Sequence, residues 1–219
     1  MKRKTVTIIG STGLIGSCLL KQLIADDTIE KIKCIVRKES TFIHPKVQVI
    51  VIDFSDRVAY KNAILGTDGV FCTVGTTQKK VMGDKEAYRK VDYDIPVTAA
   101  ELCVETGVSN FLLVSSVGAN SNSNNFYLKL KGAVEDAISK STIPSISIFR
   151  PSMLLGTRKE FRLAEKIGQQ IMRWISFLIP SNYKAIEATT VARAMVAAFH
   201  KNQASNEIYH YREMMEIQK

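Results

Sequence analysis

Short runs of hydrophobic residues alternate with segments of helical periodicity over the first 150 residues. The runs are nearly continuous in Val, Ile, Leu and Phe, which is typical of strands buried on both faces of a sheet. They cover residues 5–9, 32–36, 47–52, 69–74, 111–115 and 145–149. The helix candidates between them cover residues 15–25, 58–65, 86–105 and 124–139. This order predicts an α/β fold with a doubly wound parallel sheet of the Rossmann type.

The pattern changes after residue 150. Residues 159–178 carry apolar positions at helical spacing on one face, and residues 188–201 predict a second helix before a short apolar end. Neither segment continues the regular alternation of strands and helices. We therefore expect a single domain over residues 1–219, in which 1–150 form the core and 151–219 a small C-terminal helical cap.

The composition excludes a wholly disordered chain and leaves the partner open. Of the 219 residues, 46% are hydrophobic, which is enough for a packed core. Thirty Lys and Arg against 21 Asp and Glu give a net charge of +9, which points to a polyanion, an anionic small molecule or a membrane surface. No nucleic-acid-binding signature and no stacking arrangement of aromatic residues accompanies this charge, so we expect no nucleic-acid partner.

Targeting signals and cysteine usage indicate a cellular compartment. The N-terminal order of basic and then apolar residues is that of a secretory signal, but three glycines interrupt the apolar run and no cleavage site closes it. No apolar stretch reaches the ~20 residues of a spanning helix. Four widely spaced cysteines without a CxxC pair indicate buried thiols in a reducing compartment. We expect a soluble cytoplasmic protein without an integral membrane segment.

A glycine-rich turn follows the first strand candidate and leads directly into a helix. It reads Gly10, Ser11, Thr12, Gly13, Leu14, Ile15, Gly16. Gly10 permits the tight turn, Gly13 lets a pyrophosphate approach the backbone, and Gly16 lets helix and strand pack closely. The helix N-terminus adds unpaired N–H groups and the positive end of the helix dipole. At the first strand–helix junction of a βαβ series this turn predicts dinucleotide binding; a turn without a ligand is the alternative.

The residues after the second and third strand candidates indicate which dinucleotide binds. NAD sites usually carry an acid after the second strand for the ribose 2′-hydroxyl, whereas this chain has Arg37 and Lys38. An arginine can hold a 2′-phosphate through two hydrogen bonds, so we predict NADP(H), with NAD(H) as the alternative. Asp53 ends the third strand and is placed to meet the adenine edge, although an ordinary loop aspartate is nearly as good an interpretation. Phe54, the next residue, is a further candidate for cofactor binding.

A Tyr-x-x-x-Lys pair, Tyr127 and Lys131, opens the helix after the fifth strand candidate. The i,i+4 spacing puts both side chains on one helix face, and Ser116 stands at the end of the preceding strand. A phenol with a pKa of about 10 is a poor proton donor at neutral pH, and a nearby ammonium group brings that pKa closer to the working range. Ser116 would hold the substrate oxygen while a nicotinamide supplies or accepts hydride. We predict Ser116, Tyr127 and Lys131 as catalytic residues; a strand-end hydroxyl and an ordinary amphipathic helix are the alternatives.

In this order, the glycine turn, Ser116 and the Tyr127–Lys131 pair resemble the short-chain dehydrogenase/reductase superfamily, with a GxxGxxG spacing similar to its extended and atypical branches. Residues 111–116, 125–132, 149–151 and 191–195 are similar to its Tat-interacting-protein-like atypical group, so the resemblance covers nearly the whole chain. It implies a Rossmann fold, NADP(H) binding and an oxidoreductase acting on a small carbonyl or alcohol. Some atypical members bind the cofactor and act as regulators, so an NADP(H)-binding regulatory or interaction protein is the alternative.

Matching positions imply further residues that line the cofactor. These are Gly75, Thr76 and Thr77 after the fourth strand, Pro151 and Ser152 after the sixth, and Tyr127 with Lys131. Asp92 stands where many extended members carry asparagine, so the resemblance leaves its role open. The second substrate lobe of sugar-modifying members is largely missing, which argues against a nucleotide-sugar epimerase.

The remaining basic clusters and the histidines do not require a functional interpretation. The basic residues between 79 and 90 either attract an anionic substrate or solvate a loop, and we favour the loop. Those between 158 and 173 lie on an amphipathic helix that packs against the sheet or a second subunit by default, with an anionic membrane as the alternative. The oligomeric state stays open, a homodimer included. His44, His200 and His210 show no metal-ligand spacing, so we predict no metal site.

Overall fold

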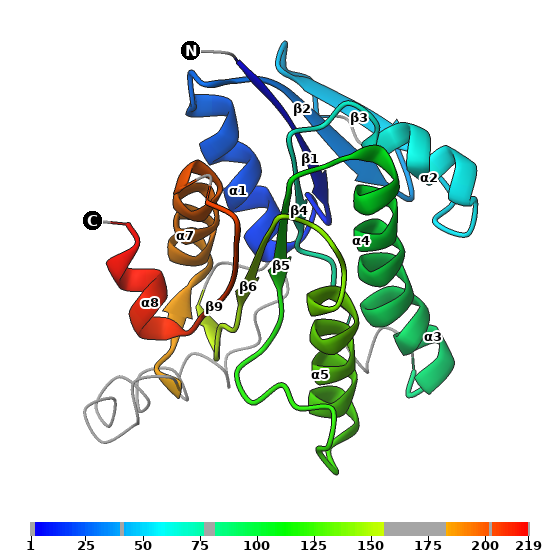
Figure 1. Cartoon of the computed structure of the whole chain (residues 1–219), viewed down its shortest axis with the longest axis vertical. Coiled ribbons are helices and arrows are strands. Elements are labelled where there is room, and N and C mark those ends of the chain that lie inside the picture. The colour runs from blue at the N-terminus through cyan, green and yellow to red at the C-terminus, as the bar shows by residue number, and fades with distance from the viewer. Residues whose placement is uncertain (1–2, 40–41, 77–81, 156–182, 202, 219) are drawn as a thin grey trace.

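A seven-stranded parallel sheet forms the centre of the molecule (Figure 1). The structure is a computed structural model that describes residues 3–39, 42–76, 82–155, 183–201 and 203–218. The strands are β1 (Lys4–Ile9), β2 (Ile29–Val36), β3 (Val47–Val51), β4 (Gly69–Cys72), β5 (Asn110–Val114), β6 (Ser145–Phe149) and β9 (Ser205–Tyr209). They lie in the order β3-β2-β1-β4-β5-β6-β9, and all neighbours are parallel. The doubly wound α/β sheet expected from the sequence is thereby confirmed.

The strand order reverses between β1 and β4. From β1 the chain winds outward through β2 and β3, and then returns to the other side of β1 as β4. Ile9 and Cys72 are paired at the ends of these two strands, and the Thr73 amide donates to the Ile9 carbonyl at 2.8 Å. The loops that follow β1 and β4 therefore begin side by side, which is where doubly wound sheets bind their ligands.

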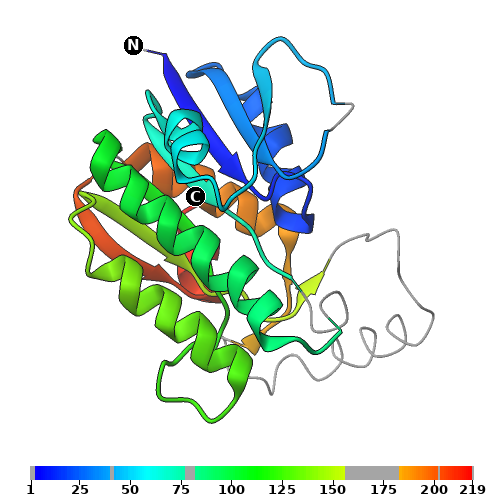
Figure 2. The same cartoon turned by 90° about the vertical axis from the view of Figure 1, so that its right-hand side faces the viewer.

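Helices cover both faces of the sheet, as Figures 1 and 2 show. One face carries α1 (Leu14–Ala25) and α7 (Ala188–Lys201), and the other carries α2 (Arg57–Ile64), α4 (Ile95–Thr106) and α5 (Phe126–Ser139). A short α8 (Tyr211–Glu216) ends the chain beside α7. None of the helices in the described ranges has the length and hydropathy needed to cross a bilayer.

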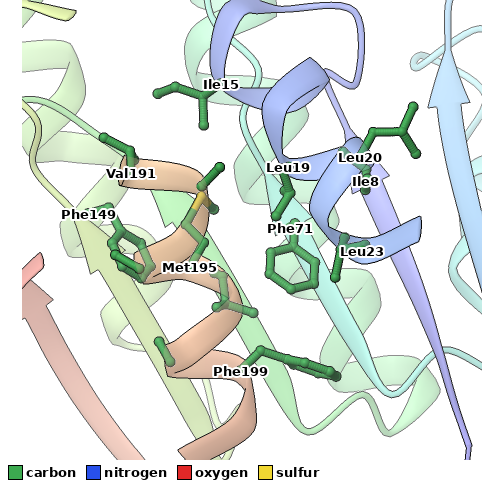
Figure 3. Close-up of a cluster of buried hydrophobic side chains, with 14 of the residues drawn as sticks. Ile8, Ile15, Leu19, Leu20, Leu23, Phe71, Phe149, Val191, Met195 and Phe199 are labelled. Carbon is green, nitrogen blue, oxygen red and sulfur yellow. The ribbon is translucent and has the colours of Figure 1, made fainter. Parts of the chain in front are cut away.

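The core between α1, α7 and the sheet fixes the position of α1 (Figure 3). Each helix contributes buried side chains at i,i+4 spacing, namely Ile15, Leu19 and Leu23 from α1 and Val191, Met195 and Phe199 from α7. Phe71 of β4 lies beneath them, with its ring centroid 5.4 Å from that of Phe199. Because this packing holds α1 along its whole length, its first turn has a defined position at the end of β1.

The helix expected over residues 86–105 is divided into three parts. It begins as α3 (Lys85–Arg89), widens into a π-helical turn, η1 (Lys90–Asp94), and continues as α4. Asp84 caps the start, where its side chain accepts from the amides of Glu86 and Ala87 at 2.8 and 3.1 Å. Pro96 lies in the first turn of α4 and has no amide hydrogen, which removes an i→i−4 hydrogen bond just where the wide turn occurs.

The segment after residue 150 contributes to the central sheet as well as to helices. The expected helix over residues 188–201 is confirmed as α7, and β9 pairs with β6 as the seventh strand, where the sequence indicated only a short apolar end. Two further short strands, β7 (Leu154–Leu155) and β8 (Ile186–Glu187), form a separate parallel pair. The expected helix over residues 159–178 lies outside the described residues.

Candidate functional site

The glycine turn after β1 packs against the start of the loop after β4. Gly10 has a φ of +93°, and a Cβ added there would lie 2.8 Å from the Thr73 carbonyl carbon and from the Val74 nitrogen. A Cβ on Gly16 would lie 2.7 Å from Thr73 Oγ1 and still closer to the Gly10 carbonyl oxygen. Any side chain at these two positions would therefore push the turn away from the sheet. Thr73 supports the turn by donating from Oγ1 toward the carbonyl oxygens of Ile9 and Gly10, at 3.2 and 3.1 Å.

The first turn of α1 can accept an anion. Gly13 is its N-cap, no side chain caps the helix, and its first turn carries no acidic residue. Thr12 and Gly13 are exposed, whereas Ser11 beside them is buried. A Cβ on Gly13 would come within 3.2 Å of the Gly10 carbonyl oxygen, so glycine also keeps this part of the turn compact. Unpaired amides, a positive helix end and a bare backbone are the features that a dinucleotide pyrophosphate requires, and the turn fits that group.

The residues expected to select the dinucleotide are exposed. Arg37 and Lys38 follow β2, whose end lies beside that of β1 and therefore near the glycine turn. Asp53 follows β3, and its Oδ1 accepts from the Ser55 amide at 2.9 Å, which holds the pKa of this carboxyl below its usual value. Phe54 is partly buried and packs edge-on against Tyr60, with ring centroids 4.9 Å apart. Asp53 thus closes a local turn while its side chain stays exposed.

The expected catalytic residues come from the start of α5 and the loop before it. Asn125 caps α5 by accepting from the amides of Tyr127 and Leu128 at 3.0 and 3.2 Å, which fixes Tyr127 in the first turn. Tyr127 is partly buried and Lys131 is buried one turn later, with its Nζ 6.0 Å from the centre of the Tyr127 ring. The spacing of this pair in the sequence therefore brings the two side chains to one side of the helix.

The loop that carries Ser116 packs directly on α5. A Cβ on Gly132 would lie 2.7 Å from the Asn120 Cα and closer still to the Ser121 nitrogen, so the loop contacts the helix at a position that only glycine allows. The Asn120 amide also donates to the Leu128 carbonyl at 3.0 Å. Ser116 itself is partly buried, and within the described ranges its hydroxyl makes one long hydrogen bond of 3.3 Å, to the Val117 carbonyl. That hydroxyl remains able to bind another oxygen.

Lys131 has a partner that the sequence did not indicate. Its Nζ lies 2.9 Å from Oδ1 of Asp92 in η1, and the side chains are 8% and 1% exposed. Asp92 Oδ2 accepts from the Thr76 amide at 2.8 Å, so one carboxylate joins Lys131 to the loop after β4. Burial alone would lower the pKa of Lys131, but the attraction of Asp92 outweighs it and raises that pKa above its usual value. The resemblance left Asp92 without a role, and only the topology brings it to α5.

A second buried ionic group lies one turn further along α5. Glu135 is paired with Arg150, whose Nε lies 3.1 Å from each carboxylate oxygen and whose Nη2 also donates to Oε2. Ser115, at the end of β5, donates its hydroxyl to Glu135 Oε1. Since this serine is occupied, Ser116 is the serine of the pair that is free to contact a ligand. The sequence did not predict this group of Ser115, Glu135 and Arg150, because its members come from three separate elements.

The other expected cofactor-lining residues lie at the same edge of the sheet. Gly75 is exposed and Thr76 partly buried, in the loop that follows β4, while Thr77 lies outside the described residues. Pro151 is buried after β6, and its carbonyl accepts from the Val117 amide at 3.0 Å. Ser152 donates its hydroxyl to the Lys184 carbonyl. The described residues of the expected site therefore follow the carboxyl ends of β1, β2, β3, β4, β5 and β6. The described residues contain no cluster of side chains suited to a metal ion.

Comparisons with known proteins identify the family of this chain. The family described as NAD(P)H-binding matches residues 10–207. Protein HTATIP2 of Rattus norvegicus is 34% identical over 199 residues, which are 90% of this chain and 81% of that protein. The mitochondrial protein FMP52 of Candida albicans is 32% identical over 195 residues, covering 86% of this chain and 85% of that one.

Solved structures show the same fold at lower sequence identity. The Bordetella bronchiseptica enzyme WbmH in complex with NAD+ has a TM-score of 0.75 at 17% identity, covering 95% of this chain and 75% of that one. The ADP-L-glycero-D-manno-heptose-6-epimerase of Helicobacter pylori has a TM-score of 0.72 at 18% identity, covering 100% of this chain and 82% of that one. The chain belongs to the NAD(P)H-binding family, in which it is an atypical short-chain dehydrogenase/reductase related to HTATIP2.

Proposed function

We propose that this protein is an NADP(H)-dependent oxidoreductase that transfers hydride to or from a small carbonyl or alcohol. The observation that carries the proposal is the placement of Tyr127 and Lys131 on one side of α5, beside the loop of Ser116 and at the same sheet edge as the glycine turn. A dinucleotide held by that turn would extend along the carboxyl edge towards these residues. The bound nicotinamide would supply or accept the hydride.

The side chains of this chain would handle the proton and the substrate oxygen. In the direction of reduction, the carbonyl carbon gains a hydride and the carbonyl oxygen gains the proton of the Tyr127 hydroxyl, which is afterwards replaced from solvent. The Ser116 hydroxyl would donate a hydrogen bond to that oxygen and hold it within reach of the phenol. Lys131 would act on Tyr127 through its charge, at the 6.0 Å separation from the ring.

Substitution of Tyr127 tests the catalytic assignment. Tyr127→Phe keeps the ring and removes the hydroxyl, so turnover of a panel of aldehydes, ketones and alcohols should be lost while NADPH binding, followed by its fluorescence, stays within about twofold. Tyr211→Phe is the matched control, because Tyr211 packs against the core beside α7; its turnover should equal that of the parent. Equal turnover in Tyr127→Phe and the parent would exclude Tyr127 as the proton donor.

The preference for NADP(H) is part of the proposal and rests on Arg37 and Lys38. Both are exposed beside the end of β1, where an arginine could bind a ribose 2′-phosphate through two hydrogen bonds. Arg37→Asp should reverse the ratio of NADPH to NADH affinity measured by titration. If NADH binds the parent as tightly as NADPH and the substitution leaves the ratio unchanged, the 2′-phosphate assignment is wrong.

A second candidate function is favoured by the Asp92–Lys131 pair. A lysine whose charge is already balanced promotes phenol ionisation less than a free one, which would suit a protein that binds NADP(H) and presents it to a regulatory partner with little turnover. The same substrate panel separates the two functions. Efficient reduction of a small carbonyl by the purified protein would exclude the regulatory function without turnover.

The cellular location is a further part of the proposal. We place the protein in the cytoplasm, because its four cysteines are free and three of them are buried, as expected in a reducing compartment. The related FMP52 of Candida albicans is named mitochondrial, so the two locations compete. Fractionation of cells that express the full chain, with markers for both compartments, distinguishes them.

A further inference from the structure

The buried pair of Asp92 and Lys131 fixes the net charge around Tyr127. Asp92 Oδ2 accepts a hydrogen bond from the Thr76 amide at 2.8 Å, whereas Oδ1 lies 2.9 Å from Lys131 Nζ as an ion-pair contact and has no hydrogen-bond partner among the described residues. A carboxylate that is 1% exposed would be costly without such partners, and an ammonium group that is 8% exposed equally so. The pair is therefore held together by burial as well as by attraction.

Asp92 faces inward from the π-helical turn, whereas Asp94, two residues later, faces outward. Asp92 and Asp94 both belong to η1, yet Asp92 is buried whereas the side chain of Asp94 is 49% exposed and lies 3.8 Å from Arg89. The two residues have the same chemistry and differ in the side of the turn from which they project. This contrast provides an internal control for any experiment on Asp92.

Two other titratable groups that the structure describes near the phenol, Tyr88 and Cys72, carry no charge at neutral pH. Tyr88 of α3 packs against Tyr127 with ring centroids 6.4 Å apart, and burial raises its pKa. Cys72 at the end of β4 is fully buried, and burial raises the pKa of its thiol to about 12. The Glu135–Arg150 pair one turn along α5 is internally balanced. Lys85 of α3 also lies near the start of α5, with its Nζ 5.5 Å from the centre of the Phe126 ring. In the described part of the chain, the buried charges beside Tyr127 are therefore those of Asp92 and Lys131.

The charge balance decides which form of Tyr127 is stable. With Asp92 ionised and Lys131 protonated, the site is neutral while the phenol keeps its proton, and loss of that proton would leave one unbalanced negative charge. If Lys131 stood alone, the site would carry one positive charge, and loss of one proton would neutralise it. Because Asp92 and Lys131 are buried and Tyr127 is partly buried, the neutral combination is favoured in each case.

We propose that Asp92 is a positioning residue that holds Lys131 and offsets part of its charge at Tyr127, so that Tyr127 keeps its proton until the substrate oxygen takes it. This inference rests on the proposed oxidoreductase function and makes it more specific. Donation from Tyr127 is the proton step of reduction, in which the carbonyl carbon gains hydride from NADPH, the oxygen gains the phenolic proton, and NADP+ is formed. The substrate class is then an aldehyde or ketone that is reduced at neutral pH.

Asp92→Asn tests the inference, with Asp94→Asn as the matched control. Phenol ionisation is followed in the cofactor-free protein by absorbance at 295 nm, and the contribution of Tyr127 is obtained by subtracting the same titration with Tyr127→Phe. Asp92→Asn should move the first proton loss of the site to lower pH by about one to three units, the usual effect of one nearby charge, and lower the alkaline limit of carbonyl reduction. Asp94→Asn should titrate like the parent.

If the single Asp92 variant fails to fold, two further variants test the inference: Lys131→Met and the double variant Asp92→Asn/Lys131→Met. The double variant removes both charges and should titrate like the parent, whereas Lys131→Met leaves Asp92 unbalanced and should ionise the phenol at higher pH. A Lys131→Met titration equal to that of the parent would overturn the charge balance. Since these titrations need no turnover, a parent without carbonyl reductase activity would overturn the proposed function and leave the result on Asp92 standing.

Discussion

The buried Glu135–Arg150 pair allows a sharp test of how this fold is held together at the site. Glu135→Gln preserves the size of the side chain and removes its charge. The Arg150 guanidinium, whose side chain is 21% exposed, then faces an amide with one oxygen in place of two, and the Ser115 hydroxyl competes for that oxygen. The substitution therefore leaves a partly buried cation without a counter-charge.

The size of the effect follows from this geometry. Removal of one member of a buried ion pair costs about 3–5 kcal/mol, because the other charge stays buried and unpaired. For a chain of this length that loss corresponds to a fall in Tm of roughly 10 °C, at about 2–4 °C per kcal/mol. The exposed Arg57–Glu101 pair, at 2.8 Å with side chains 49% and 54% exposed, is the comparison. Glu101→Gln is the same chemical change beside the same type of partner and should alter stability hardly at all.

Urea unfolding at pH 7, followed by circular dichroism, measures both variants against the parent. We expect a clear fall in the unfolding midpoint for Glu135→Gln and a midpoint within experimental error for Glu101→Gln, with unchanged m-values in both. An equally small change in the two variants would show that burial does not set the strength of the Glu135–Arg150 pair, and the reasoning from exposure would be refuted.

Three further predictions follow from the packing and the pKa directions. Gly16→Ala should weaken NADPH binding at least about tenfold by displacing the phosphate-binding turn. Gly66→Ala is the control: Gly66 has a φ of +73° and open space around it, so this variant should lose about 1 kcal/mol of stability and bind NADPH like the parent. Equal NADPH binding by the two variants would contradict the packing argument. Cys18 should be the one thiol of the native chain that reacts rapidly with Ellman's reagent at pH 8, because the other three are buried and the pKa of Cys72 is raised to about 12; peptide mapping identifies the labelled thiol. Although partial burial of the carboxyl acts in the opposite direction, hydrogen bonds from Thr28 and His200 lower the pKa of Asp26. Ionised Asp26 therefore stabilises the fold at pH values above the unfolded pKa of about 3.9, and this stabilisation is lost as the pH falls through the folded pKa. Asp26→Asn should therefore reduce the free energy of unfolding at pH 7 and lose this effect near pH 2, and a loss independent of pH would contradict it.

The elements that the sequence predicts well are those with strong local signals. The six expected strands are runs of β-branched and aliphatic residues, and the structure confirms each of them within a few residues. The seventh strand, β9, was missed because it lies at the edge of the sheet and alternates between partly buried and exposed positions. The π-helical turn in the helix expected over residues 86–105 was missed for a different reason: its residues are compatible with an ordinary α-helix, and only Pro96 marks the irregularity.

The candidate site divides in the same way. The glycine turn and the Tyr127–Lys131 pair depend on spacing within one segment, and spacing can be read from a sequence. The partners of these residues depend on contacts between segments. Asp92 reaches Lys131 across 39 positions, and Ser115 joins Glu135 and Arg150 because β5 lies beside β6. An aspartate in a helix is usually a solvated residue, so nothing local distinguishes Asp92 from the exposed Asp94.

One face of α5 joins the proposed chemistry to the stability of the fold. Tyr127, Lys131 and Glu135 follow one another at i,i+4 spacing, and the two charged residues are each paired with a residue from another element. Lys131 is tied to η1 and, through Asp92, to the loop after β4, while Glu135 is tied to the ends of β5 and β6. A shift of α5 by a fraction of a turn would break both buried pairs at once, so the position of the Tyr127 hydroxyl depends on the Glu135–Arg150 pair, which the proposed reaction does not use, as well as on the Lys131–Asp92 pair.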